Sequence, residues 1–197
     1  MWLVLLMACS APSPVQPATT TAETPGWQTA IAQWHYEDPL PDVPLVDHTG
    51  TARSLAQFRG QHLLVGFIYT ACPDAAACPM TTARMVSIQQ RLSESPAPLH
   101  LLSLTLDPGR DTPETLTAYA QTHGADLQTW TFATGEPALM TDGLPSLFNV
   151  LSLPDADGTL DHTIKLALLD PSGRQIAEWK DNAVSADDVF AAMVPSP

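Results

Sequence analysis

Two runs of hydrophobic residues stand out along the chain, at positions 63–69 and 100–106. The run at 63–69 is continuously apolar, which is typical of a strand that is covered on both faces of a sheet, and we interpret 100–106 as a second strand of this buried type. The segment at 79–92 predicts an amphipathic helix, because its apolar side chains recur at helical spacing. The residues that form this expected stripe are Ala83, Met85, Ile88 and Leu92.

The remaining segments predict shorter elements. Thr112 followed by Pro113 and Glu114 is a helix-start pattern, and that helix is expected to run to about residue 123. The other expected elements are a short strand that turns at 47–50, a strand at 130–133, a helical or irregular segment at 138–150, a hairpin of 163–169 and 175–179, and a helix at 185–193. This order predicts a single α/β domain, with a thioredoxin-like sheet that has some antiparallel pairing and is flanked by helices.

The N-terminus has the pattern of a targeting segment. Residues 2–8 are apolar and end at Cys9, and a run this short is far below the ~20 residues that span a bilayer. Because Ala8 precedes the cysteine, we interpret residues 1–9 as a lipoprotein-type signal that ends at a lipidated Cys9, although no Lys or Arg precedes the apolar run. The alternative is an apolar tail with an incidental cysteine.

The segment that follows is rich in Pro, Thr and Ala, so we interpret residues 10–38 as a tether and lead-in, and residues 39–194 as the folded domain. This organisation predicts an extracytoplasmic lipoprotein that is anchored to a membrane and faces the periplasm or the cell exterior. Paired cysteines can form disulfides in such a compartment. If Cys9 is lipidated, Cys72 and Cys78 remain as a pair.

Composition excludes one class of partner. The 197 residues include 8 Lys and Arg against 21 Asp and Glu, which gives a formal net charge of −13. A chain this acidic has no electrostatic footprint for phosphate backbones, so no nucleic-acid partner is expected. Hydrophobic residues make up 45% of the chain, which suffices for an ordinary core.

The two internal cysteines lie where a predicted strand gives way to a predicted helix. Cys78 precedes Pro79, so we expect Cys78 to be the N-cap of the helix, with the lowered thiol pKa that such a position confers. In one continuous helix, Cys72 and Cys78 would be separated by about 9 Å of rise, so joint action requires a loop that folds back. A structural disulfide across this short loop would contribute only ~2.4 kcal/mol. We therefore favour thiol exchange or metal capture.

Several separated motifs resemble one known family. The segment FIYTACPDAAACPM at 67–80 is similar to the signature of the SCO/SenC family, the thioredoxin-fold proteins involved in cytochrome c oxidase assembly. The resemblance extends over roughly residues 40–180. It includes DHTGTARSLAQFRGQHLLVGFIYT, LDPGRDTPETLTAYA, Trp130, Thr134-Gly135 and DHTIKLALLDPSGR, in that order. The family usually has three residues between its cysteines, whereas this chain has five.

The resemblance implies a copper site made by Cys72, Cys78 and His162. Two thiolates suit a soft cuprous ion, and imidazole is an acceptable third ligand, so Cu(I) is the expected metal. The implied function is delivery of copper to the copper-site subunit of cytochrome c oxidase, switched by oxidation of the Cys72–Cys78 pair to a disulfide. Asp161-His162-Thr163 stands where an ordinary thioredoxin has a cis-proline, which favours metal binding over simple dithiol exchange.

Two alternatives stay open at this point. The chain could be a thiol–disulfide oxidoreductase that acts on cysteines of a partner, with Cys72 or Cys78 as the attacking thiol and His162 dispensable. Whether the protein is an enzyme or a metallochaperone is therefore undecided. A peroxidase or a plain interaction module of thioredoxin fold is a weaker third reading, because paired cysteines disfavour a single-thiol peroxidase.

Other residues with reactive side chains receive structural interpretations. Asp107, Arg110 and Asp111 follow a neighbouring core strand and could lie near the site, but we favour the interpretation that they form an ion pair and the start of a helix. Asp74 is expected to form a turn in the cysteine loop, and Met80 is expected in the core together with Met85. The histidines not expected to bind metal are His35, His48, His62, His100 and His123.

Overall fold

The computed structural model describes residues 24–154 and 159–194. Its strands are β1 (Pro44–Asp47), β2 (Ala52–Ser54), β3 (His62–Ile68), β4 (Leu99–Thr105), β5 (Trp130–Thr134), β6 (Ser152–Pro154), β7 (Leu160–His162), β8 (Lys165–Leu169) and β9 (Gln175–Lys180). Its helices are α1 (Gly26–Ala32), η1 (Leu55–Phe58), α2 (Cys78–Glu94), α3 (Pro113–Thr122), η2 (Leu139–Gly143), α4 (Leu144–Leu147) and α5 (Ala186–Ala192). Cys9 lies outside the described residues, so the predicted signal and anchor stay predictions.

Seven strands form one sheet, in the order β2-β1-β5-β4-β3-β8-β9. The three central strands β3, β4 and β5 are parallel, and β3 pairs with β4 along its whole length, from His62 opposite Leu99 to Ile68 opposite Thr105. The outer strands pair antiparallel with their neighbours. This mixed sheet confirms the predicted α/β fold with some antiparallel pairing. The short strands β6 and β7 form a separate two-stranded hairpin.

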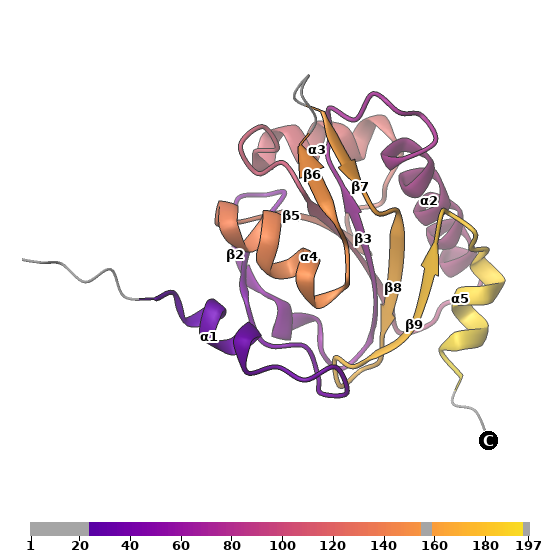
Figure 1. Ribbon diagram of the computed structural model, residues 1–197. Coiled ribbons are helices and arrows are strands. Elements are labelled where there is room, and N and C mark those ends of the chain that lie inside the picture. The colour runs from indigo at the N-terminus through magenta and orange to yellow at the C-terminus, as the bar shows by residue number, and fades with distance from the viewer. Residues whose placement is uncertain (1–23, 155–158, 195–197) are drawn as a thin grey trace, which may run out of the picture.

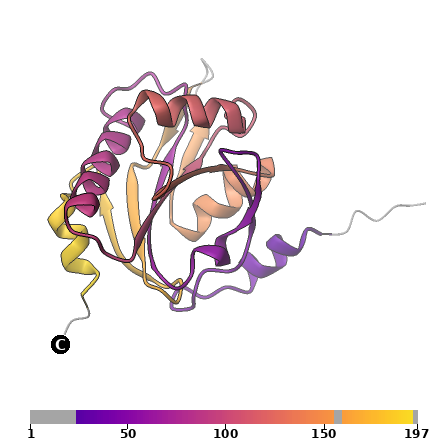
Figure 2. The same ribbon diagram turned by 180° about the vertical axis from the view of Figure 1, so that it is seen from behind.

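Helices cover the sheet on both faces, which explains why its central strands are buried and mostly apolar. On one face, α1, η1, η2 and α4 enclose a first cluster of buried residues, and on the other, α2, α3 and α5 enclose a second. Figures 1 and 2 show these two layers from opposite sides. In the described part of the chain, no helix combines the length and apolarity needed to cross a membrane.

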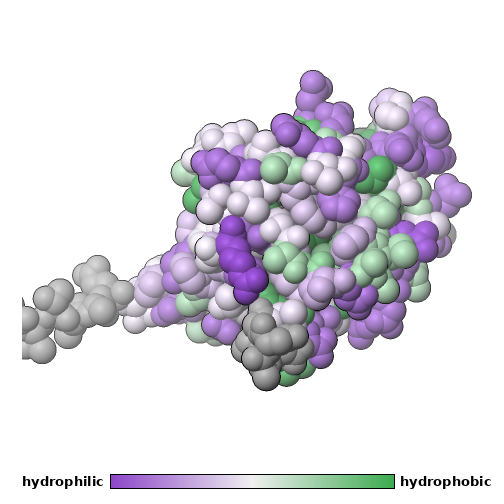
Figure 3. Space-filling model, turned by 90° about the horizontal axis from the view of Figure 1, so that it is seen from above, coloured by the Kyte–Doolittle hydropathy of each residue, from purple (hydrophilic) through white to green (hydrophobic). Residues whose placement is uncertain are grey.

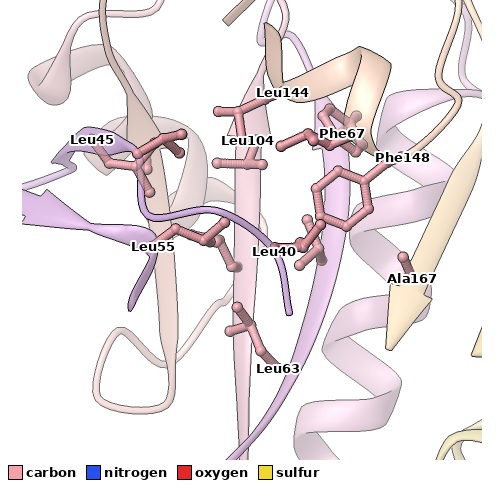
Figure 4. Packing of buried hydrophobic residues seen from close by; sticks show 14 of the residues in the cluster. Leu40, Leu45, Leu55, Leu63, Phe67, Leu104, Leu144, Phe148 and Ala167 are labelled. Carbon is pink, nitrogen blue, oxygen red and sulfur yellow. The ribbon is translucent and has the colours of Figure 1, made fainter. Parts of the chain in front are cut away.

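The first cluster is centred on the aromatic pair Phe67 and Phe148, whose ring centroids lie 5.4 Å apart in an edge-to-face arrangement. Figure 4 shows this pair among the leucines of the same cluster. On the opposite face, Gly66 leaves room for side chains from helix α2 and strand β8. A Cβ at Gly66 would lie 2.8 Å from Leu166 Cδ2 and 2.9 Å from Met85 Sδ. Strand β3 therefore depends on a residue without a side chain at this point.

The structure corrects three expectations drawn from the sequence. Helix α2 begins at Cys78 and its N-cap is Ala77, so Cys78 is not the capping residue. Ala83 is exposed, and the buried side of α2 instead includes the polar side chains of Thr81 and Thr82 beside the apolar stripe. Met80 is 39% exposed, whereas Met85 is buried as expected.

Candidate metal centre

The cysteines lie at the carboxyl end of the parallel strands, where open α/β sheets commonly bind ligands. Residues 69–77 connect β3 to α2 and form the loop that carries Cys72. Asp74 shapes this loop, because its side chain accepts a hydrogen bond from Ala76 N (2.8 Å) and its carbonyl accepts one from Ala77 N (3.1 Å). The expectation of a turn at Asp74 is confirmed. The loop thereby folds back instead of continuing α2 toward the strand.

Cys78 lies inside the second core cluster with 0% exposure. Its sulfur accepts a hydrogen bond from the Tyr69 backbone N–H at 3.4 Å. Burial raises the pKa of the Cys78 thiol well above its ordinary value, and the nearby Cys72 raises it further, although the Tyr69 N–H works in the opposite direction. The expected low pKa was wrong, because burial of the sulfur outweighs its place at the helix start. Near neutral pH the thiol is protonated.

His162 reaches Cys78 from a different part of the chain. It ends β7, 84 residues after Cys78 in sequence, and its Nε2 lies 3.2 Å from Cys78 Sγ. Its other nitrogen, Nδ1, lies 3.2 Å from the carbonyl oxygen of Thr163. A proton on Nδ1 would donate to that carbonyl and leave the Nε2 lone pair directed at the thiol.

The charge state of His162 agrees with this arrangement. Burial lowers the pKa of the imidazole, while the Thr163 carbonyl and Asp161 act in the raising direction without overcoming it. The ring is therefore neutral near pH 7. A neutral imidazole and a protonated thiol are both uncharged, so burial does not disfavour this pair. Both groups can bind a metal once the thiol proton has left.

Cys72 lies beside this pair but takes no part in the contact between Cys78 and His162. It is half-buried, and its sulfur lies 3.7 Å from the carbonyl oxygen of Asp74. It interacts with both Cys78 and Tyr69, and raises the pKa of each. Both cysteines are free thiols. Within residues 24–154 and 159–194, no three His, Cys, Asp or Glu side chains are close enough together to hold a metal ion as they stand.

Asp111 supports the start of the cysteine loop, so for this residue the alternative of a position near the site holds and the favoured interpretation does not. Its buried carboxylate accepts hydrogen bonds from Thr70 N (3.1 Å), Thr70 Oγ1 (2.5 Å) and Thr105 Oγ1. The expected ion pair forms between Arg110 and Asp107, at 3.0 Å, without Asp111. The expected helix start is confirmed at the next residue, where Thr112 caps α3.

Two further residues hold the site together, and neither was singled out from the sequence. The Tyr69 hydroxyl bonds to the backbone of Leu160 in β7. Asn182 donates from Nδ2 to the carbonyl of Ala76 (3.1 Å), and its Oδ1 accepts from Thr81 Oγ1 (2.9 Å). Both contacts join segments about 90 to 106 residues apart. For Tyr69, its position next to the cysteine loop was a sequence signal of a role at the site. For Asn182 the sequence offered none.

The surface around His162 is partly apolar. A cavity of about 180 Å³ is lined by Leu151, Leu153, Asp161, His162 and Thr163. Leu151 and Leu153 are 61% and 52% exposed. Seen from above in Figure 3, hydrophilic residues predominate and the apolar areas are small and separate. The site therefore opens onto a mixed surface.

Comparisons with known proteins place these features in a family context. The family model described as SCO1/SenC matches residues 40–194. The human mitochondrial SCO2 homolog is 34% identical over 135 residues, which cover 67% of this chain and 50% of that protein. A candidate copper-binding protein of Stutzerimonas stutzeri is 28% identical over 87% of this chain and 81% of its own. The chain thus spans about half the length of the human relative.

Solved structures with the same fold include a SCO1/SenC family lipoprotein of Bacillus anthracis. Its TM-score is 0.71 at 22% identity, covering 80% of this chain and 94% of that one. The structure of BsSco, named as a Sco-family cytochrome c oxidase assembly protein with a disulfide switch, gives a TM-score of 0.67 at 23% identity, covering 80% and 96%. At these identities the likeness establishes the fold, which confirms the predicted thioredoxin-like domain.

Proposed function

This chain belongs to the SCO1/SenC family, and we propose that it binds copper as Cu(I) and delivers it to the copper-site subunit of a cytochrome c oxidase. The ligands in this proposal are Cys72, Cys78 and His162. The name of the Stutzerimonas stutzeri relative, and the oxidase-assembly role named for BsSco, support the choice of metal and recipient.

The observation that carries the proposal is the contact between Cys78 Sγ and His162 Nε2 at 3.2 Å. A thiol and an imidazole nitrogen that meet from positions 84 residues apart form two sides of a site that suits a soft cuprous ion. Cys72 supplies the third side by moving within its loop, since it is half-buried and already interacts with Cys78.

Copper uptake and redox state are coupled through the two sulfurs. Cu(I) replaces the proton of the Cys78 thiol, so binding releases that proton to water. Oxidation joins the two sulfurs in a disulfide and passes two electrons and two protons to an oxidised partner thiol–disulfide couple. The disulfide has no thiolate left to bind metal, so only the reduced protein carries copper.

The proposal also includes a location. A lipidated Cys9 would hold the domain at the outer side of a membrane, with residues 10–38 as tether and lead-in. The lipoprotein named among the solved structures supports this organisation. Delivery to a membrane-bound oxidase requires such proximity, because a tethered donor meets its recipient at a raised effective concentration.

A competition titration tests the proposal. The reduced full chain is titrated with Cu(I) against a chromophoric chelator, beside the variants Cys72→Ala, Cys78→Ala and His162→Ala. We expect one tightly bound copper, lost in both cysteine variants and weakened in His162→Ala. His35→Ala is the matched control, because His35 is exposed, and it leaves the affinity unchanged.

The same variants discriminate the oxidoreductase alternative. Disulfide reductase activity that persists in His162→Ala, together with the absence of tight copper binding in the unmodified chain, would assign the cysteines to thiol exchange. Tight copper binding that survives either cysteine substitution would remove the proposed ligand set.

A further inference from the structure

Tyr69 touches every part of the proposed copper site. It directly follows β3 and is 3% exposed. Its backbone N–H donates to Cys78 Sγ at 3.4 Å. Its hydroxyl, at the far end of the side chain, donates to the carbonyl of Leu160 (3.2 Å) and accepts from the N–H of the same residue (3.3 Å). A hydroxyl can do both, because it carries one donor and two acceptor lone pairs.

Leu160, whose backbone bonds to the Tyr69 hydroxyl, lies two positions before His162 on β7. That strand has three residues and pairs only with the equally short β6 in a sheet of two strands. An isolated hairpin of this size is marginal in water, so its position depends on attachments to the rest of the fold. The Leu160 side chain packs against both core clusters, and the Tyr69 hydroxyl fixes the Leu160 backbone.

The Tyr69 ring also restrains the imidazole itself. The two ring centroids lie 5.8 Å apart, with the planes at 76°, which is an edge-to-face contact. The carbonyl of Thr163 holds the opposite side of the imidazole through Nδ1. Between these two contacts the ring has one orientation, in which Nε2 faces Cys78.

We propose that Tyr69 is a positioning residue for the copper-binding imidazole. This inference rests on the proposed function. The hydroxyl holds β7 against the cysteine loop, so that His162 keeps the orientation in which Nδ1 faces the Thr163 carbonyl and Nε2 lies beside the sulfur, and the ring packs against the imidazole. Tyr69 touches no metal itself. It acts through His162, and its contribution to copper affinity disappears when that imidazole is absent.

A double-mutant cycle on Cu(I) affinity tests the inference in the reduced full chain. Tyr69→Phe keeps the ring and removes both hydrogen bonds to Leu160, together with the interaction of the hydroxyl with Cys72. We expect it to weaken Cu(I) binding by about 5- to 150-fold, the effect of two lost neutral hydrogen bonds. In a His162→Ala background the same substitution has no further effect, because the group being positioned is gone.

Tyr119→Phe is the matched control. Tyr119 is half-buried, and its hydroxyl bonds to Thr82 Oγ1 at 2.8 Å on helix α2 instead of to β7. Tyr119→Phe removes a tyrosine hydroxyl that also lies near the cysteines but makes no bond to β7. We expect it to leave Cu(I) affinity within about twofold of the unmodified chain.

A second measurement does not depend on copper. Nitrogen–proton correlation spectra of the metal-free reduced chain report which nitrogen of His162 carries the proton. We expect the Nδ1–H tautomer in the unmodified chain and in Tyr119→Phe, and a mixture of tautomers in Tyr69→Phe.

The outcomes separate the two proposals. Equal weakening by Tyr69→Phe with and without His162 would overturn the inference, because the hydroxyl would then act on the sulfurs or on the fold. An unchanged tautomer in Tyr69→Phe would overturn it as well. If His162→Ala binds copper as well as the unmodified chain, the proposed ligand set fails, and the tautomer measurement alone decides whether Tyr69 positions the ring.

Discussion

Asn182 holds the cysteine loop from the far end of the chain, and we predict that Asn182→Asp loosens the loop. The residue is 9% exposed and has a φ of 57°, in the left-handed region that asparagine tolerates better than most residues. Aspartate keeps the size and the acceptor that faces Thr81 Oγ1. It lacks the N–H that donates to the carbonyl of Ala76, and it places a charge in a poorly solvated position.

The expected loss follows from these contacts. One lost hydrogen bond and a partly desolvated carboxylate together reduce the free energy that keeps the loop closed by ~1–3 kcal/mol. Cys78 has 0% exposure, so a thiol reagent reaches it only when the loop opens. Each 1.4 kcal/mol changes the open population tenfold, so alkylation of Cys78 in Asn182→Asp should be about 5- to 150-fold faster.

Alkylation with a neutral reagent, followed by mass spectrometry of the Cys78 peptide, measures this rate in the reduced chain. Asn182→Gly tolerates the left-handed backbone but has no side chain, and should label at least as fast as Asn182→Asp. Asn149→Asp is the matched control, because Asn149 also has a positive φ, of 49°, but is exposed. Equal Cys78 labelling in Asn182→Asp and the unmodified chain would refute the role of the amide.

Three other predictions concern stability. Burial raises the pKa of Asp47, but hydrogen bonds from Thr49, Arg53 and Thr51 outweigh it and lower the pKa from 3.8 to about 2. Because the folded pKa lies below the unfolded one, this stabilisation is present above pH 3.8 and is lost as pH falls through about 2. Asp47→Asn should therefore lower the unfolding free energy by ~2 kcal/mol at pH 7, and urea titrations should show the difference closing below pH 4. Gly66→Ala should cost ~1–3 kcal/mol in the same assay, since its Cβ would meet Leu166 Cδ2 at 2.8 Å, whereas a Cβ at Gly26, which meets nothing within 4 Å, should be harmless. Oxidation of Cys72 and Cys78 to a disulfide should raise the unfolding free energy by up to ~2.4 kcal/mol. If the oxidised chain is less stable than the reduced chain, the disulfide strains the folded protein and this prediction is wrong.

The large elements could be predicted because their sequence signals are local. The runs at 63–69 and 100–106 differ from β3 and β4 by one residue at each end, because strands covered on both faces are rich in apolar residues. The start of α3 followed from Thr112 and Pro113, whose backbone preferences act within one turn.

The missed elements depend on contacts that no local pattern carries. Helix α1 lies within the segment interpreted as tether and lead-in, and its Trp27 and Ile31 pack against the first core cluster. A Cβ on Gly143 would lie 2.8 Å from Trp27, so this packing uses a glycine more than 110 residues away. Strands β6 and β7 have three residues each, too few for a period of two to appear.

The chemistry of the site, like the fold, could be predicted where the signal is local and not where it depends on distant segments. The sequence and its resemblance to the SCO/SenC family indicated which three residues to consider, and the fold brings Cys78 and His162 into contact. The pKa of Cys78 was predicted in the wrong direction. Position at a helix start is readable from Pro79, whereas the depth of burial depends on the second cluster, to which distant strands and helices contribute.

Burial also gives the two cysteines different tasks. Cys78 has 0% exposure and a thiol with a raised pKa, so a partner molecule can neither reach it nor find it as a reactive thiolate in the closed protein. Cys72 is half-buried and lies in the loop that reaches the surface. If the proposed copper site is correct, a recipient's ligand would approach the copper from the side of Cys72, and we expect Cys72 to be the first protein ligand displaced. A partner disulfide would also meet the Cys72 sulfur first, so metal transfer and thiol exchange would begin at the same residue. The two functions then differ in their dependence on His162, which only copper binding requires.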